Sequence, residues 1–217
     1  MADPKLRVVN YNVAKLIGDT DSMKETINKT REDKDSVVGA FVFQEVTQDN
    51  LRILQGMVGS DYSLGTFTDS GDSEHGGAQA IFYKRDMFRE RSRLHSDIYT
   101  GAGRRGDRWT LRSKADGEDL VIYGAHLKAF PDEEDKRNQG VMAIREDMKM
   151  LAPNTRTIVA GDMNFYSTDE PGYKGFVDMG LSPAKPAPSV TKTEDPLFDP
   201  DLAKKIKEVQ GFQGVLP

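Results

Sequence analysis

Short apolar runs recur along the chain and alternate with amphipathic or polar segments, and this alternation constrains the fold more than any other feature. The longest runs, at residues 37–43 and 120–125, are too short to cross a bilayer but have the length of buried strands. Segments in which apolar residues return every three or four positions follow several of them. This pattern predicts an α/β protein whose sheet is covered by helices.

The expected elements follow from the periodicity of each segment. Strands are expected at residues 6–12, 37–43, 78–84, 109–114, 120–126 and 156–161. Helices are expected at residues 22–34 with a cap within 19–21, at 47–58 with Thr47 as cap, from Pro131 onward, and at 170–179. Residues 68–77 are expected to form a surface loop. Because hairpins are mixed with crossovers, we expect a layered sheet protein and not a purely parallel sheet.

The last part of the chain differs from the rest in composition and in hydrophobic pattern. Six of the ten prolines lie between Pro183 and Pro217, and strand-like alternation stops there. We therefore expect one folded core over residues 1–182 and a proline-rich tail over 183–217. The tail should be loop except for a short helix at residues 201–210, which has Pro200 before its start and Gly211 after its end.

Composition excludes several kinds of chemistry. The chain has no cysteine, so disulfides, thiolate nucleophiles and cysteine zinc sites are ruled out, and a metal would need oxygen ligands or the three histidines. A net charge of −5 argues against binding nucleic acid through overall charge. Residues 84–114, however, contain ten Lys or Arg against four Asp or Glu, which predicts either a basic face or a charged edge strand.

Polar side chains stand where four of the expected strands end, and they are the candidates for a site. Each has an ordinary explanation when taken alone, as a solvated strand end, a turn former or a half-buried histidine. Together they predict a site at one sheet edge, because strand ends place side chains on neighbouring loops. Carboxylates there would suit a hard cation such as Mg²⁺. The candidates are Asn12, Glu45, His126, Asp162 and Asn164.

These segments occur in the order found in the endonuclease/exonuclease/phosphatase superfamily, which the chain resembles over about residues 5–181. Residues 7–13 (RVVNYNV), 43–46 (FQEV), 123–128 (YGAHLK) and 160–165 (AGDMNF) resemble its four site motifs. Residues 78–84 and 107–109 resemble the strand pair between them. The resemblance implies a four-layer αββα sandwich of the deoxyribonuclease I type.

The resemblance also implies a divalent-metal-dependent hydrolase acting on phosphate esters, with a role for each candidate. The cation would be Mg²⁺, with Mn²⁺ or Ca²⁺ as alternatives. The implied roles are Glu45 and Asn12 for the metal, Asp162 for the attacking water, His126 and Asn164 for the phosphate, and Arg108, followed by Arg104 or Arg105, for a phosphate oxygen.

One family motif is not found. The superfamily closes with an "SDH" segment whose histidine completes the site, and this chain has no histidine after His126. His75 and His95 lie between other motifs, so the missing role is not transferred to them. We therefore expect a fold that is incomplete at its C-terminus, a site completed by a further segment or a second chain, and slow turnover by this segment alone.

The substrate is less constrained than the chemistry. A nuclease is the first expectation, on DNA before RNA, with a phosphatase of small phosphate esters and a non-catalytic binding protein as alternatives. Residues 128–137 are acidic and poor in aromatics, so we expect no stacking platform and no membrane-inserting hairpin. The chain starts without an apolar signal segment and resembles bacterial members, so either the cytoplasm or secretion as a mature protein fits.

Overall fold

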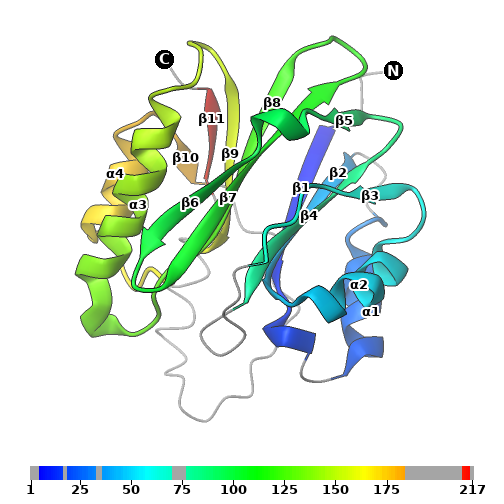
Figure 1. The fold of residues 1–217 in the computed structure, drawn as a ribbon, viewed down its shortest axis with the longest axis horizontal. Coiled ribbons are helices and arrows are strands. Elements are labelled where there is room, and N and C mark those ends of the chain that lie inside the picture. The colour runs from blue at the N-terminus through cyan, green and yellow to red at the C-terminus, as the bar shows by residue number, and fades with distance from the viewer. Residues whose placement is uncertain (1–4, 17–18, 33–35, 70–76, 184–211, 216–217) are drawn as a thin grey trace.

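Two sheets pack face to face, and each is covered on its outer side by helices (Figure 1). The computed structural model describes residues 5–16, 19–32, 36–69, 77–183 and 212–215. The order of layers is helices, four-stranded sheet, seven-stranded sheet, helices, which is the four-layer αββα sandwich that the family resemblance implied.

The four-stranded sheet has the order β1-β2-β4-β3. Its strands β1 and β2 are parallel, whereas β4 is antiparallel to both of its neighbours. The helices α1 and α2 cover its outer face. The elements are β1 (Lys5–Asn12), η1 (Ala14–Leu16), α1 (Thr20–Lys29), β2 (Ser36–Val46), η2 (Gln48–Asn50), α2 (Leu51–Val58), β3 (Tyr62–Leu64) and β4 (Ala78–Lys84).

The seven-stranded sheet has the order β10-β11-β9-β8-β7-β5, with β6 also paired to β7. Its central strands β8 and β9 are parallel, and the other pairs are antiparallel. The helices α3 and α4 cover its outer face. The elements are β5 (Phe88–Glu90), η3 (Ser92–Leu94), β6 (Ser96–Gly101), β7 (Arg104–Ser113), β8 (Asp119–His126), η4 (Pro131–Glu133), α3 (Glu134–Met148), β9 (Arg156–Asp162), α4 (Pro171–Val177), β10 (Ser182–Pro183) and β11 (Phe212–Val215).

The strands β2 and β8, one in each sheet, are buried on both faces, which explains why their sequences are continuous apolar runs. In β2, Phe41 and Phe43 pack toward the helices, while Val42 packs toward the other sheet. In β8, Tyr123 packs toward α3, while Ile122 faces inward. The molecule thus has three apolar layers, one between the sheets and one under each pair of helices, as a four-layer sandwich requires.

Several predicted boundaries need correction. The first helix was expected at residues 22–34, but α1 starts at Thr20, where the Asp19 carboxylate accepts hydrogen bonds from the amides of Asp21 and Ser22. It ends at Lys29, and the Thr30 hydroxyl then donates to the Ile27 carbonyl. The segment 47–58 divides into η2 and α2, and the Thr47 side chain makes no capping hydrogen bond.

Some strands lack a run of apolar residues, and these were predicted too short or not predicted at all. Strand β7 starts at Arg104 and not at residue 109, because β6 pairs along its first half. The short strands β3, β5, β6 and β10 were not predicted. The tail was expected to be loop outside its helix, which is wrong at β11, since Phe212–Val215 pairs with β9. The predicted helix 201–210 and most of the predicted loop 68–77 lie outside the described residues.

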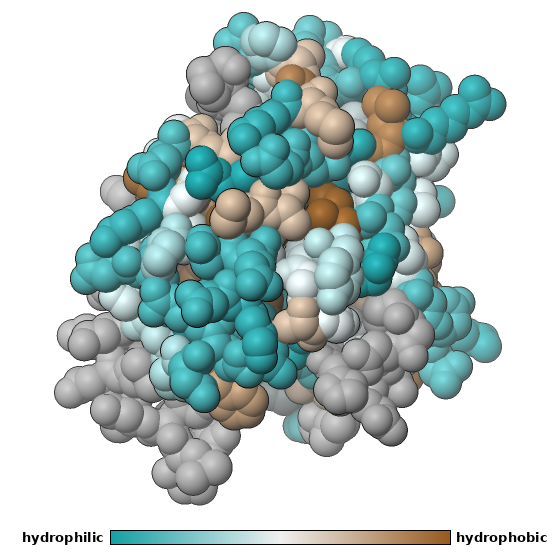
Figure 2. Space-filling view, turned by 60° about the vertical axis from the view of Figure 1, so that its left-hand side comes forward, coloured by the Kyte–Doolittle hydropathy of each residue, from teal (hydrophilic) through white to brown (hydrophobic). Residues whose placement is uncertain are grey.

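The surface carries little continuous apolar area on the side that bears α3 and α4. Figure 2 shows hydrophilic side chains over most of this face and hydrophobic ones in small separate spots. None of the helices in the described residues is both long enough and apolar enough to span a membrane.

Candidate active site

The four predicted strand ends meet at one edge of the sandwich, the lower edge in Figure 1, where β1 passes into η1 and β8 runs toward α3. Parallel pairing brings them together, because Asn12 lies opposite Gln44 in the first sheet and His126 lies opposite Asp162 in the second. The two sheets then face each other at this edge, so side chains far apart in sequence become neighbours.

Glu45 occupies a special backbone position. The register between β2 and β4 shifts between Phe43 and Val46, and Glu45 within this bulge has a φ of 58°. A bulge with left-handed backbone re-aims a side chain, and such strain is found mainly at functional positions. The bulge therefore supplies a physical reason why this carboxylate can leave the strand pattern and turn toward Asn12.

Asn12 joins the carboxylates of the two sheets. Its Nδ2 donates to Glu45 Oε1 at 2.9 Å and to Asp162 Oδ2 at 3.1 Å, while its Oδ1 accepts a hydrogen bond from the Ala14 amide at 2.9 Å. The amide orientation is thus fixed at both ends. Asn12 orients the two carboxylates and turns its own oxygen away from them.

A second set of hydrogen bonds joins the two sheets farther from the edge and supports the contacts of Asn12. Gln44 Nε2 donates to Asn10 Oδ1 at 2.8 Å, and Asn10 Nδ2 donates to the Gly161 carbonyl at 3.1 Å. Gly161 must approach β8 closely, since a Cβ there would lie 2.0 Å from the Ala125 carbonyl oxygen. Glycine at this position therefore allows Asp162 to sit beside His126.

His126 lies between the two carboxylates and beside an arginine. Its Nδ1 is 3.9 Å from Glu45 Oε1 and its Nε2 is 3.9 Å from Asp162 Oδ2. Arg104 Nη1 is 2.7 Å from His126 Nδ1. Because a guanidinium can only donate, Nδ1 accepts, and the proton of the neutral ring is on Nε2, facing Asp162.

Asn164 lies next to the site, but its side-chain amide donates to a backbone carbonyl. Its Nδ2 donates to the Leu127 carbonyl at 2.9 Å, and its backbone amide donates to Asp162 Oδ1 at 3.2 Å. Its φ of 50° is one that asparagine tolerates. Asn164 thereby connects the loop after β9 to the loop after β8.

The structure separates the three arginine candidates. Arg104 contacts His126, whereas Arg105 Nε is 2.7 Å from Asp97 Oδ1 and Arg108 Nη1 is 2.6 Å from Asp147 Oδ1 on α3. Arg108 therefore lies on the helix side of its sheet and is not brought to the carboxylates. Of the three, Arg104 is the arginine at the site.

Half of the ten basic side chains in the stretch 84–114 lie in ion pairs with nearby carboxylates. Lys84, Arg91, Arg105, Arg108 and Arg112 all lie in ion pairs. Two of the partners, Asp119 and Asp147, come from outside the stretch, so a charge count over the stretch overstates its positive field.

A histidine–aspartate pair lies farther along the inner face of β7. His95 Nε2 is 2.8 Å from Asp107 Oδ1, and Asp107 is the cross-strand partner of Gly124, two residues before His126. Burial raises the pKa of the Asp107 carboxyl, and His95 opposes this shift only in part.

Sequence reasoning missed a buried ion pair behind the two site loops. Arg137 on α3 donates from Nε to Glu170 Oε2 at 2.8 Å and from Nη2 to Glu170 Oε1 at 3.0 Å. Arg137 also donates to the Phe130 carbonyl, and Glu170 accepts from the Tyr166 amide at 2.7 Å. An arginine in a polar helical segment gives no sequence signal for such a role.

The donor set fits a hard divalent cation that also binds water and substrate. Side chains of Glu45 and Asp162 are 22% and 21% exposed, so solvent and ligands can reach them, whereas His126 is 6% exposed. No group of three His, Asp or Glu side chains in the described ranges is arranged to hold a metal by itself. Mg²⁺ commonly takes one or two carboxylates and completes its shell with waters and phosphates.

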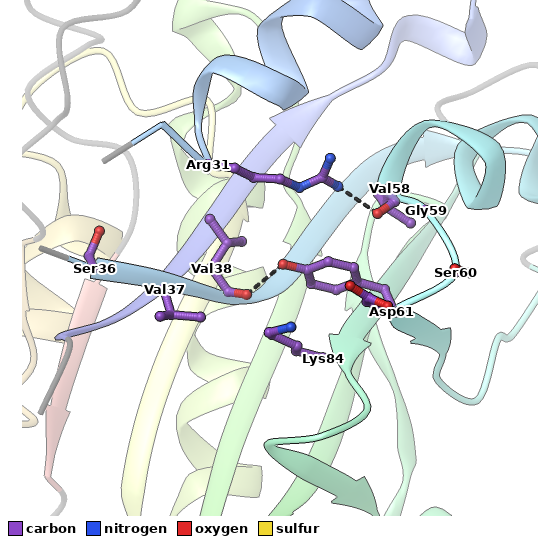
Figure 3. Close-up of a pocket in the computed structure, with 10 residues that line it drawn as sticks. Arg31, Ser36, Val37, Val38, Val58, Gly59, Ser60, Asp61 and Lys84 are labelled. Atoms are coloured by element: carbon purple, nitrogen blue, oxygen red, sulfur yellow. Dashed lines mark hydrogen bonds between the residues drawn. The ribbon is translucent and has the colours of Figure 1, made fainter. Parts of the chain in front are cut away.

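A separate pocket of about 450 Å³ lies at the opposite end of the four-stranded sheet (Figure 3). Arg31 and Tyr62 form part of its wall, and their dashed hydrogen bonds run to the carbonyls of Val58 and Val38. The pocket is lined by Ser36, where β2 starts, whereas Glu45 is near the end of the same strand. It is therefore not part of the candidate site.

The layered fold is that of deoxyribonuclease I-like proteins. The model of the Endonuclease/Exonuclease/phosphatase family matches residues 9–194, and the chain belongs to this family. Its enzymes are hydrolases of phosphate esters, typically dependent on divalent metal. No curated protein matches the sequence.

Solved structures of the same fold include proteins of several activities. The human Nocturnin catalytic domain with bound sulfate has a TM-score of 0.68 at 18% identity, over 98% of this chain and 83% of that one. A mannosyl-6-phosphatase from Bacteroides thetaiotaomicron has a TM-score of 0.64 at 20% identity, covering 81% and 72%. Danio rerio TDP2 with single-strand DNA product has a TM-score of 0.60 at 15% identity, covering 82% and 66%. At these identities the likeness shows the fold.

Proposed function

We propose that this chain hydrolyses phosphate esters with the help of a divalent cation at the edge where Asn12, Glu45, His126 and Asp162 meet. The observation that carries the proposal is the convergence of two carboxylates, one from each sheet, on the Asn12 amide nitrogen. Two partly exposed carboxylates held in this way repel each other unless a positive partner lies between them, so the arrangement favours a bound cation.

Each residue has a defined task in this proposal. Glu45 and Asp162 would hold Mg²⁺, or Mn²⁺ or Ca²⁺ in its place, and the ion when bound neutralises charge on the phosphate oxygens. Asp162 accepts a proton from the attacking water, whose oxygen forms the new bond to phosphorus as the bond to the leaving oxygen breaks. The Nε2 proton of His126 and the guanidinium of Arg104 supply hydrogen bonds to the developing charge.

The leaving oxygen also needs a proton, and the sequence offers no histidine after His126 for that task. General acid catalysis contributes about 10²–10⁴-fold, so turnover by this chain alone should be slow. The rate of hydrolysis should be reduced least for esters whose leaving group is stable as an anion, because such a group needs no proton. A further segment or second chain that brings a proton donor to this edge should restore the rate on ordinary esters.

For the substrate, we propose a nucleic acid phosphodiester, DNA before RNA. A structural neighbour of the chain, TDP2, was solved with a single-strand DNA product, which supports this choice. A small phosphate ester is the second candidate. It is favoured by the ion pairs that hold half of the basic side chains in the stretch 84–114, and by the sugar-phosphate phosphatase among the neighbours.

The test compares two reactions of the purified chain, nicking of supercoiled plasmid and release of phosphate from small esters, each with Mg²⁺, with Mn²⁺ and with chelator. We expect cation-dependent hydrolysis that is lost in Glu45→Gln and Asp162→Asn. The control is Glu146→Gln, which changes an exposed carboxylate on α3 that contacts Lys149. Hydrolysis that persists in the two site variants would overturn the proposal.

A non-catalytic binding protein is the remaining alternative, and thermal unfolding separates it from an enzyme. A cation that binds the native state raises the melting temperature whether or not turnover follows. A rise that depends on Glu45 without hydrolysis of either substrate class would identify a metal-binding scaffold and contradict the proposed activity.

A further inference from the structure

We infer that Phe130 is a specificity-determining residue, whose exposed ring stacks on a flat ring of the substrate, such as a nucleobase attached to the phosphate ester. The inference rests on the proposed function and deepens it, because it names the feature of the substrate that this site recognises beyond the phosphate.

Phe130 lies on the loop that leaves the site. It follows His126 by four residues, and the residue is 61% exposed. The same loop is fastened to the other site loop, since Asn164 Nδ2 donates to the Leu127 carbonyl and the Phe130 amide donates to the Tyr166 hydroxyl at 3.1 Å. The loop that carries Phe130 is therefore fastened beside the segment that carries Asp162 and Asn164.

The backbone of Phe130 is strained, which shows that its placement is specified. Its φ is 80°, a left-handed value that costs a bulky residue free energy and that loops usually assign to glycine. An ordinary exposed phenylalanine needs no such conformation. An exposed aromatic ring on a strained backbone lowers the stability of the fold, so stability does not explain why the residue is there.

The strain is held by the buried pair of Arg137 and Glu170. Their side chains are 1% and 4% exposed, and Arg137 donates to the carbonyls of Lys128 and Pro131 at 3.3 and 3.4 Å in addition to that of Phe130. Buried ion pairs seldom add net stability, but they can fix geometry. Here the pair fixes the backbone of the loop before substrate arrives, which lowers the entropic cost of ordering the loop on binding.

Two tyrosine rings, unlike the ring of Phe130, have a cation over the ring. Arg137 lies over Tyr166 at 5.1 Å, and Arg105 lies over the exposed Tyr99 at 5.9 Å. Among the described side chains, no ring or cation is stacked on Phe130. The inference departs from the sequence-based expectation that residues 128–137 offer no stacking platform, and the experiments below decide between the two.

The first test uses matched substrates in the presence of Mg²⁺. One is a short single-stranded oligonucleotide and the other is the same backbone without bases, so that the scissile bond and leaving group are alike. Because removal of an aromatic ring that stacks on one base weakens binding about tenfold or more, we expect Phe130→Ala to lower kcat/KM on the normal strand by that factor and to leave the abasic strand unchanged.

Two further variants make the result specific. Phe130→Trp keeps a flat ring and should retain the preference for bases, whereas Phe130→Leu keeps apolar bulk and should lose it. Met150→Ala removes another exposed apolar side chain, 73% exposed just beyond the end of α3, and should have no effect. Equal loss on both substrates in Phe130→Ala, or no loss on either, would overturn the inference.

A binding readout separates this inference from the proposed activity. The chain has one tryptophan, Trp109, which is fully buried, so the indole introduced by Phe130→Trp adds an exposed fluorophore that reports directly on the loop. Its emission should be quenched by a nucleoside 5′-monophosphate and not by ribose 5-phosphate. Quenching without hydrolysis would contradict the proposed activity alone. Equal quenching by the two ligands, or none by either, would contradict the stacking role even in an active enzyme.

Discussion

The Nδ2 of Asn12 lies 2.9 Å from Glu45 Oε1 on the neighbouring strand, and the same nitrogen reaches Asp162 on the other sheet. This amide is the contact that keeps the two carboxylates aimed at one point, so its removal should loosen a metal site without removing a carboxylate. Groups that orient metal ligands commonly contribute 10–100-fold to affinity or activity.

We therefore predict that Asn12→Ala weakens cation binding and hydrolysis about 10–100-fold, whereas Glu45→Gln abolishes both. The melting temperature measured across a Mn²⁺ titration gives the affinity, and initial rates give the activity. An Asn12→Ala protein that binds the cation as tightly as the parent would show that the carboxylates are held by other contacts.

Arg104 and Arg108 should have opposite phenotypes although they are four residues apart. Arg104→Ala should lower kcat/KM with little change in melting temperature, because Arg104 contacts His126. Arg108→Ala should leave Asp147 without its guanidinium and cost about 3 kcal/mol of stability, the range for breaking a mostly buried pair. Chemical denaturation and steady-state rates measure the two effects, and a reversed pattern would contradict the assignment.

Tyr123 should make the protein sensitive to alkali. Burial, and then the hydrogen bond to Asp147, raise the pKa of its phenol in the folded state. Above pH of about 10 the unfolded chain releases this proton while the folded chain retains it, so stability falls as pH rises. In Tyr123→Phe the free energy of unfolding should fall less steeply, the difference amounting to about 1.4 kcal/mol in total between pH of about 9 and 11. Denaturation curves over this range give the difference, and an unchanged slope would be the contrary result.

Glycine at position 161 should be essential for both folding and activity. In Gly161→Ala the new Cβ would lie 2.0 Å from the Ala125 carbonyl oxygen, so β8 and β9 must separate beside His126 and Asp162. Overpacking of this kind costs about 1–3 kcal/mol or more. Gly56→Ala is the control, because nothing lies within 4 Å of its Cβ and alanine favours the helix. A lower melting temperature in the first variant and an equal or higher one in the second are expected.

The sequence was most informative where burial determines the pattern. Strand β4 was predicted at its observed bounds because residues 78–84 are apolar and buried, and the strand-end cluster followed from the same reasoning. Strand β6 was not predicted because Ile98 is its one buried apolar side chain, which is too little for a pattern, and its place is set by backbone pairing with β7. Arg108 was ranked above Arg104 because the predicted strand began at residue 109. The sequence therefore did not show that Arg104 is the first residue of β7, beside His126, whereas Arg108 lies within the strand and contacts Asp147.

The residues that hold the site loops were also beyond sequence reasoning. The pairing of Arg137 with Glu170 joins a helix to a loop across 33 positions, and neither residue has a distinctive neighbourhood. The strained Phe130 looks like an ordinary residue before a proline until its φ is known. Such features depend on tertiary contacts, which local patterns do not encode.

One half of the acidic site is carried by each sheet, and the apolar layer between the sheets sets how far apart those halves stand. Side chains such as Val42 and Ile122, which lie within that layer, therefore act as spacers for the chemistry at the edge. For the proposed metal site, enlarging or shrinking these side chains should alter which ion the two carboxylates prefer.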